Sequence, residues 1–151
     1  MTDVAHPISP HRPQPLRPVI VLFVIFASVM AVVGLSKWNV PAEKVNWGDQ
    51  YAPAVERARA ENKPLLLYFT AEWCGPCQQM RRNVWTDQAV ADAAAAYIPV
   101  RIDVDKQPQL AEQFQVPSYP FFFVIDPAGR IVRVFDRGAD ATEFAGWLGQ
   151  R

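Results

Sequence analysis

LLLYFTAEWCGPC, residues 65–77, is the stretch of sequence that decides the fold of this chain. Its first five residues form a continuous apolar run of strand length, which is typical of a strand covered on both faces. Pro76 suits the first turn of a helix, where its missing N–H does no harm. The stretch therefore predicts a strand that leads directly into a helix, with Cys74 and Cys77 at the junction.

The sequence after this stretch continues to alternate between helices and strands. Further strands are predicted at Ile98 to Asp103, Phe121 to Ile125 and Ile131 to Phe135. Helices are expected at residues 49–62, 76–85, 87–96, 108–114 and from 140 onward. A strand, a helix and a second strand imply a parallel crossover, whereas the last two strands form a tight antiparallel hairpin. We therefore expect an α/β fold, with a mixed central β-sheet flanked by α-helices.

Two aspartates are the expected N-caps of predicted helices. Asp87 precedes the alanine-rich helix, and Asp140 is followed three residues later by Glu143, which is the pattern of a capping box. The last helix should place Phe144, Trp147 and Leu148 on one face.

An uncharged apolar run, Val19 to Leu35, precedes the whole pattern. It is just long enough to span a hydrocarbon core, and a domain this small cannot surround a helix that is apolar on every face. We interpret residues 19–36 as a transmembrane anchor, after a disordered proline-rich tail at 1–18 and before a linker at 37–44. Residues 45–151 would form the domain. A cleaved signal peptide is the alternative, but the run is long and no clear small-x-small cleavage site follows it.

The charges that flank the apolar run give little information about orientation. Arg12 and Arg17 precede the run and Lys37 and Lys44 follow it, so the positive-inside count is nearly balanced. A short tail, one span and a long domain are how exported domains are commonly tethered. The expectation is a single-pass protein of the inner (cytoplasmic) membrane, with the domain facing the periplasm or the cell exterior.

Composition excludes several classes of function. Lys plus Arg and Asp plus Glu number 15 each, so the chain lacks the basic excess that nucleic-acid binding requires. The chain has only two cysteines, and its two histidines, His6 and His11, lie in the tail. A disulfide framework, a four-cysteine zinc site and haem attachment are therefore not expected. We expect no metal and no cofactor, electrons that arrive through another protein's thiols, and a monomer.

The two cysteines have different expected roles. Free backbone N–H groups and the positive end of the helix stabilise a thiolate at Cys74, which makes this residue the nucleophile. Cys77 lies one turn later, close enough to attack a mixed disulfide at Cys74 and release the partner, so it is the resolving thiol. Gly75 permits close approach of a backbone. The structural alternatives are an inert buried disulfide or two core thiols that never react.

Two stretches of the chain resemble a known family. Residues 68–77, YFTAEWCGPC, are similar to the active-site stretch of thioredoxins, and residues 116–121, VPSYPF, are similar to their cis-proline loop. The resemblance implies that Pro120 is cis, that backbone groups around Tyr119 bind a substrate, and that Trp73 is a surface lid over the cysteines. A core aromatic is the alternative for Trp73, and plain packing is the alternative for Tyr119.

The resemblance extends over about Val45 to Gly149, and further residues indicate a particular branch of the family. Residues 62–64, NKP, and 83–87, NVWTD, are similar to the C-terminal periplasmic domain of transmembrane thiol:disulfide interchange proteins and to small membrane-anchored thioredoxins. We therefore expect this chain to act on client proteins with disulfides or thiols, and a membrane-bound or soluble thiol protein to donate the electrons.

Three positions near the cysteines depart from the family or are ambiguous. Tyr68 occupies the position where thioredoxins usually hold a buried aspartate that assists proton transfer from the resolving thiol. Arg101 falls where a lysine is common, and we interpret it as a solvated charge at a strand end. Glu72 could act on the cysteines through water, or be an ordinary exposed carboxylate.

The sequence thus predicts a membrane-anchored thiol:disulfide oxidoreductase that acts as a reductant of other proteins. A protein disulfide oxidase or isomerase is one alternative, because the direction of exchange depends on the redox potential and on the partner. A non-catalytic module that only binds clients is another.

Overall fold

The computed structural model describes residues 17–37 and 41–150. The chain divides into two compact units, Met1–Val40 and Pro41–Arg151. In the first unit, helix α1 covers Arg17–Lys37, which contains the apolar run, and the side chains of residues 18–32 are all exposed. Among the described residues, no helix is both long enough and apolar enough to cross a membrane. The predicted tail up to residue 16 and residues 38–40 of the predicted linker lie outside the described residues.

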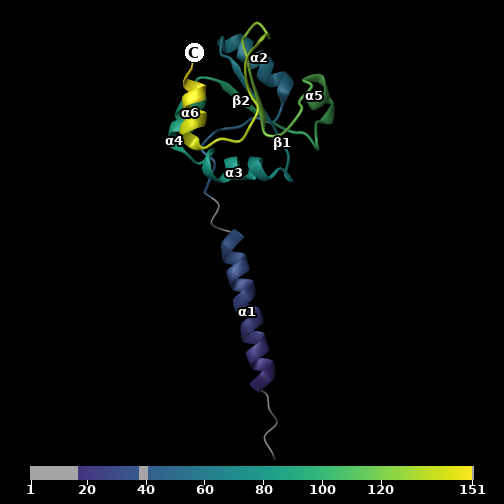
Figure 1. The fold of residues 1–151 in the computed structure, drawn as a ribbon, viewed down its shortest axis with the longest axis vertical. Helices are drawn as coiled ribbons and strands as arrows, with labels where there is room; N and C mark the ends of the chain where they lie inside the picture. Colours follow the sequence, from purple (N-terminus) through teal and green to yellow (C-terminus); the bar gives the residue numbers. More distant parts are fainter. Residues whose placement is uncertain (1–16, 38–40, 151) are drawn as a thin grey trace, which may run out of the picture. The chain divides into compact units, whose positions relative to one another are not determined.

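The second unit is built on a four-stranded sheet in the order β2-β1-β3-β4 (Figure 1). The central strand β1 (Leu65–Thr70) pairs in parallel with β2 (Ile98–Asp103) and antiparallel with β3 (Phe121–Ile125). Strand β4 (Ile131–Phe135) completes an antiparallel hairpin with β3. The predicted mixed sheet is confirmed, with all four strands at their expected positions.

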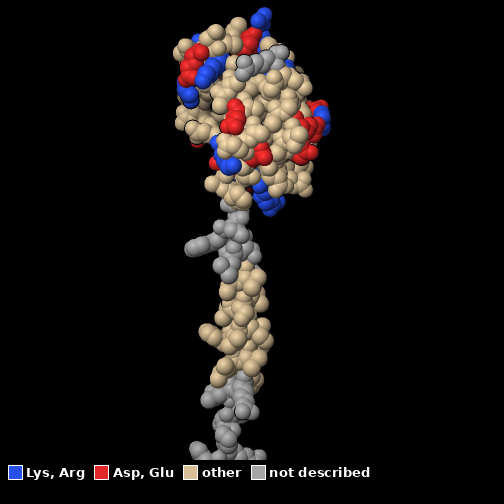
Figure 2. All heavy atoms as spheres, turned by 90° about the vertical axis from the view of Figure 1, so that its left-hand side faces the viewer, with Lys and Arg blue, Asp and Glu red and all other residues tan. Residues whose placement is uncertain are grey.

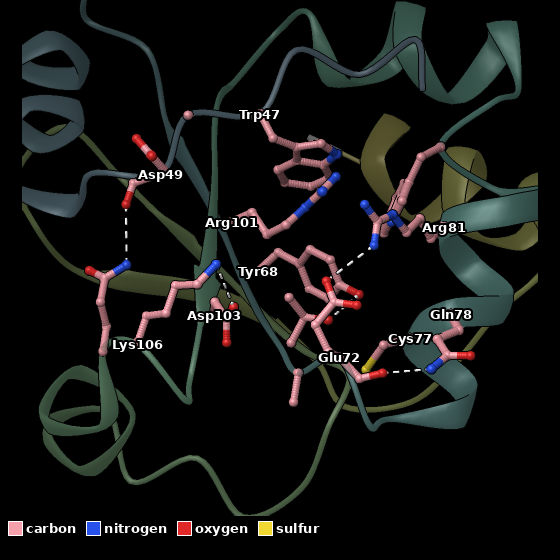
Figure 3. Close-up of a pocket in the computed structure, with 15 residues that line it drawn as sticks. Trp47, Asp49, Tyr68, Glu72, Cys77, Gln78, Arg81, Arg101, Asp103 and Lys106 are labelled. Carbon is pink, nitrogen blue, oxygen red and sulfur yellow. Dashed lines mark hydrogen bonds and ion pairs between the residues drawn. The ribbon is translucent and has the colours of Figure 1, made fainter. Parts of the chain in front are cut away.

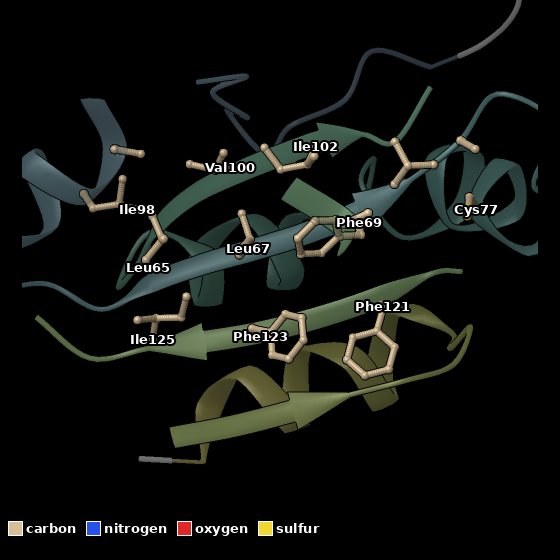
Figure 4. Packing of buried hydrophobic residues seen from close by; sticks show 14 of the residues in the cluster. Leu65, Leu67, Phe69, Cys77, Ile98, Val100, Ile102, Phe121, Phe123 and Ile125 are labelled. Carbon is tan, nitrogen blue, oxygen red and sulfur yellow. The ribbon is translucent and has the colours of Figure 1, made fainter. Parts of the chain in front are cut away.

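Helices lie on both faces of this sheet, as predicted. They are α2 (Tyr51–Glu61), α3 (Gly75–Asn83), α4 (Gln88–Ala94), α5 (Pro108–Gln113) and α6 (Ala141–Gly149). Successive side chains of β1 point to opposite faces, so this strand contributes to two hydrophobic clusters. Leu65, Leu67 and Phe69 pack with residues of α2 and α5 and with both cysteines (Figure 4), whereas Leu66 and Tyr68 pack with residues of α3, α4 and α6.

Both predicted N-caps are present, but the capping box is only half formed. Asp87 Oδ1 accepts the Val90 N–H at 3.2 Å, and Asp140 Oδ1 accepts the Glu143 N–H at 2.9 Å. The Glu143 carboxylate pairs instead with Arg137 at 2.5 Å, because that guanidinium lies within its reach. On α6, Phe144 and Leu148 are fully buried and Trp147 packs beside them, as expected.

The residues before α2, Pro41–Gly48, form an entry segment that packs on the domain. The Lys44 N–H donates to the Trp85 carbonyl at 2.6 Å, and Val45 is buried. Gly48 forms an isolated parallel bridge with Val100 of β2, in which its N–H and carbonyl both take part. This bridge keeps the chain extended, so α2 begins at Tyr51 and not at 49. The compact unit therefore includes residues 41–44, which the sequence pattern assigns to the linker.

Candidate active site

The two cysteines lie at the junction between the central strand and α3. Cys74 is the N-cap residue of α3, and its Sγ is bonded to that of Cys77 in a disulfide of 2.01 Å. The Cys77 N–H donates to Cys74 Sγ at 3.2 Å, so a backbone donor of the first helical turn already points at this sulfur. The same donor and the positive helix end would stabilise a Cys74 thiolate after reduction. No atom lies within 4 Å of a Cβ added at Gly75, which leaves this turn open to an approaching partner.

The loop before β3 brings Tyr119 against Trp73, the residue that precedes Cys74. The Tyr119–Pro120 peptide bond is cis, as the resemblance predicts, and Pro120 is buried. The Trp73 and Tyr119 rings meet edge to face at 5.8 Å. Trp73 is 65% exposed and its Nε1–H donates to Asp105 Oδ1 at 3.2 Å. Trp73 is therefore a surface residue beside the disulfide, and the core-aromatic alternative is wrong.

A second surface feature adjoins Cys77. A cavity of about 340 Å³ opens beside Cys77, and Figure 3 shows the residues that line it. Tyr68 and Arg101 line its inner part, whereas Glu72, which is 76% exposed, and Lys106, which is 79% exposed, line its rim. Cys77 itself is only 2% exposed, although it is one of the residues that line this cavity.

Tyr68, the residue in place of an aspartate, is held among aromatic rings. It is 1% exposed, stacks on Phe122 at 4.5 Å and donates its hydroxyl to Thr70 Oγ1 at 3.1 Å. Burial raises its pKa above the usual value, against smaller opposing effects from the Thr70 hydrogen bond and the nearby Arg101 guanidinium. Tyr68 is therefore neutral near neutral pH and cannot supply the negative charge of a carboxylate.

Arg101 is not a solvated strand-end charge, so that interpretation is wrong. Its side chain is 24% exposed, lies over the Trp47 ring at 5.3 Å and pairs with Glu43 Oε2. Glu43 also accepts a hydrogen bond at Oε1 from Arg81 Nε, at 3.1 Å. One carboxylate of the entry segment thus holds an arginine of β2 and an arginine of α3.

Glu72 is an exposed carboxylate, but it has a partner. Its Oε1 accepts from Arg81 Nη1 at 3.3 Å, and its backbone carbonyl accepts from the Gln78 side chain at 2.5 Å. Glu72 therefore forms the outer end of a chain of charges that runs through Arg81 and Glu43 to Arg101.

The contribution of the entry segment to this site could not be predicted from the sequence. Glu43 and Arg101 are 58 residues apart in sequence, and neither residue belongs to a recognisable motif. The only available signal was the bulky Trp47 close before α2, which indicates packing against the domain but not against which residues. Within the described residues, no group of three or more His, Cys, Asp and Glu side chains could hold a metal ion. His6 and His11 lie outside the described residues.

Comparison with known proteins assigns the chain to a family. The family profile described as Thioredoxin-like matches residues 46–127, more than half of the chain, so the chain belongs to the thioredoxin-like family. Thioredoxin H2 of Arabidopsis thaliana is 32% identical over 85 residues, which cover 56% of this chain and 62% of that protein. The chain thus matches less than two thirds of the length of this relative.

Solved structures with the same fold also share appreciable sequence identity with this chain. A thioredoxin from Thermus thermophilus superposes with a TM-score of 0.62 at 29% identity, and 71% of this chain and 86% of that chain are covered. The C-terminal domain of DsbD from Neisseria meningitidis, in its reduced form, superposes with a TM-score of 0.57 at 25% identity, covering 65% and 90%.

Proposed function

We propose that this protein is a thiol:disulfide oxidoreductase that exchanges the Cys74–Cys77 pair with the thiols or disulfides of client proteins. The observation that carries the proposal is the disulfide at the start of α3, with the Cys77 N–H directed at Cys74 Sγ. This position supports Cys74 as the nucleophile, since a helix N-terminus stabilises the thiolate that attacks. The open turn at Gly75 and the exposed Trp73 beside Tyr119 support docking of a client next to it.

The reaction proceeds in two exchange steps. In the first, the Cys74 thiolate attacks one sulfur of the client disulfide, forms a mixed disulfide and displaces the second client sulfur as a thiolate. In the second, the Cys77 thiolate attacks Cys74 Sγ, the Cys74–client bond breaks, and the first client sulfur leaves with the electron pair. The client gains two electrons and two protons, and the chain ends as the Cys74–Cys77 disulfide. Another thiol protein must then reduce the chain for the next cycle.

Insulin reduction by the full-length chain in detergent, with dithiothreitol as electron source, tests this proposal. Cys74→Ser should abolish the catalysed rate, because no nucleophile remains. Cys77→Ser, reduced and then freed of dithiothreitol before insulin is added, should retain the first step and accumulate a mixed disulfide with insulin, visible on a non-reducing gel. If Cys74→Ser kept the full rate, the proposal would be wrong. A module that only binds clients would show no rate in the parent and equal client binding in the parent and in Cys74→Ser.

We further infer that the protein acts as a reductant. The similarity of the active-site stretch to thioredoxins supports this direction, since thioredoxin has a potential of about −270 mV. The measurement is the equilibrium between the Cys74–Cys77 pair and a series of glutathione or dithiothreitol redox buffers. A value near that of thioredoxin supports a reductant. A value far above about −200 mV would favour an oxidase or isomerase instead.

We also propose that α1 anchors the protein in the inner membrane, with the domain in the periplasm. The uncharged sequence from Val19 to Leu35 supports an anchor, as do the side chains of Val19, Phe23 and Phe26, which are 65%, 73% and 60% exposed. Figure 2 shows neither acidic nor basic side chains on the described part of α1 in that view.

Fractionation of bacterial cells that express the full-length chain tests the anchor and the location. An anchored chain stays with the membranes in alkaline carbonate, whereas recovery in the carbonate supernatant would contradict the anchor. A periplasmic domain is cleaved by added protease once the outer membrane is permeabilised. Protection until the inner membrane is lysed would place the domain in the cytoplasm.

A further inference from the structure

Glu43 is the one carboxylate in the described residues that contacts both arginines of the Cys77 cavity. Arg81 and Arg101 line this cavity, and Glu43 pairs with Arg81 Nε at 3.1 Å and with Arg101. The Glu43 and Arg101 side chains are 21% and 24% exposed, so this ion pair is largely shielded from solvent. Charges in such a position are screened less than charges on an open surface, and they act on a nearby buried group.

The remaining charges around the cavity compensate one another in part. The charged residues that line it are Asp49, Glu72, Arg81, Arg101, Asp103 and Lys106. Lys106 pairs with Asp103 at 3.1 Å, and Glu72 reaches only Arg81, at 3.3 Å. Glu43 is therefore the carboxylate that compensates Arg101, and its loss would leave excess positive charge at the cavity wall.

Cys77 is the group that would respond to this charge. It is 2% exposed, and burial disfavours the thiolate that it must become before it can attack Cys74. Nearby cations favour the thiolate. Arg81 lies one turn after Cys77 on α3, a spacing that places two side chains on the same face of a helix.

We propose that Glu43 is a positioning residue that sets how readily the Cys77 thiol ionises, by compensating the charges of Arg81 and Arg101. The inference rests on the proposed function and concerns its second step. In that step the Cys77 thiol gives its proton to water in the cavity, and the thiolate displaces the client sulfur from Cys74. Glu43 touches neither sulfur and acts through the two arginines.

The test measures the ionisation of Cys77 alone, without any client. The chain has two cysteines, so Cys77 is the sole thiol of the full-length Cys74→Ser protein, and its thiolate can be followed by ultraviolet absorbance against pH. Adding Glu43→Gln should raise the acid dissociation constant of Cys77 about threefold to tenfold, and Arg101→Gln should lower it by a similar factor. The double variant should return towards the Cys74→Ser parent, and Glu43→Asp should stay close to it.

A remote ion pair provides the matched control. Glu56 pairs with Arg59 on the exposed surface of α2 at 3.3 Å, so Glu56→Gln removes one acidic charge away from the cavity and should leave the Cys77 titration unchanged. Circular dichroism checks that each variant is folded. If Glu43→Gln does not fold, Arg101→Gln carries the test with the opposite sign.

The proposal is overturned if the Glu43 and Arg101 variants leave the Cys77 titration unchanged or shift it in the same direction. A shift in the same direction would indicate looser packing, whose effect does not depend on the sign of the charge removed. Insulin reduction by the chain with both cysteines tests the proposed function separately. An inactive chain with opposite charge-dependent shifts would contradict the oxidoreductase and retain the role of Glu43 in ionisation.

Discussion

Replacing Tyr68 with phenylalanine removes one hydroxyl group from the wall of the Cys77 cavity. The ring should keep its stacking on Phe122, at 4.5 Å, and its contacts with Trp47 and Trp85, so no large cavity forms. The loss is the hydrogen bond to Thr70, whose net contribution is about 0.5–1.5 kcal/mol. We expect the free energy of unfolding of the oxidised full-length chain to fall by that amount at neutral pH.

The same variant should change how stability depends on pH. Burial raises the pKa of Tyr68 in the folded chain, whereas in the unfolded chain this tyrosine ionises near its ordinary value of about 10. The contribution of the hydroxyl is therefore fully present below about pH 10 and is lost as the pH rises towards the folded pKa. Above about pH 10, the stability deficit of Tyr68→Phe relative to the parent should shrink.

Urea unfolding, followed by tryptophan fluorescence at a series of pH values from neutral to alkaline, measures both effects. Val134→Ala, an exposed change on β4, is the control that retains Tyr68, and its stability should run parallel to that of the parent. If Tyr68→Phe also ran parallel to the parent through the alkaline range, the hydroxyl would not be held in its neutral form by the fold. The raised pKa that burial gives Tyr68 would then be contradicted.

Three further substitutions test the core, a helix cap and the surface of the site. Phe122→Ala removes a fully buried ring that packs between the sheet and α6, and it should cost about 3–5 kcal/mol in urea unfolding; a loss below about 1 kcal/mol would contradict this packing. Asp140→Ala deletes the N-cap of α6 and should lower stability by about 1 kcal/mol in thermal unfolding, whereas Asp140→Asn should recover most of the loss. Trp73→Ala should change stability by less than about 0.5 kcal/mol, because this side chain is 65% exposed, and yet raise the KM for insulin; an unchanged KM would exclude Trp73 from client docking.

The sequence was sufficient for the parts of the fold that depend on local pattern. Continuous apolar runs such as Phe121 to Ile125 predict buried strands, because a strand covered on both faces has no position for a polar side chain. The N-caps at Asp87 and Asp140 could also be predicted from local sequence, because a cap acts within one helical turn. The predicted helix ends were less accurate. Helix α4 ends at Ala94 and not at 96, because helix propensity alone does not determine the residue at which a helix ends.

The charges around Cys77 could not be predicted, because they meet only in the folded chain. Arg101 forms an ion pair that is largely shielded from solvent, because Glu43 approaches it from a segment 58 residues away. The Arg81 side chain likewise meets Glu43 across 38 residues. A charged residue at the end of a strand has no local feature that distinguishes a solvated side chain from a paired one. The prediction that Arg101 is a solvated charge was therefore wrong.

Strand β1 has a consequence for the dynamics of the site. It is hydrogen-bonded to β2 on one edge and to β3 on the other, and its side chains are buried on both faces of the sheet. Backbone amides in such a strand exchange with deuterium only in the rarest and largest opening events of a protein. Cys74 lies four residues beyond this strand. The hydrogen bonds of β1, which supports the disulfide, should therefore remain intact in every fluctuation short of global unfolding.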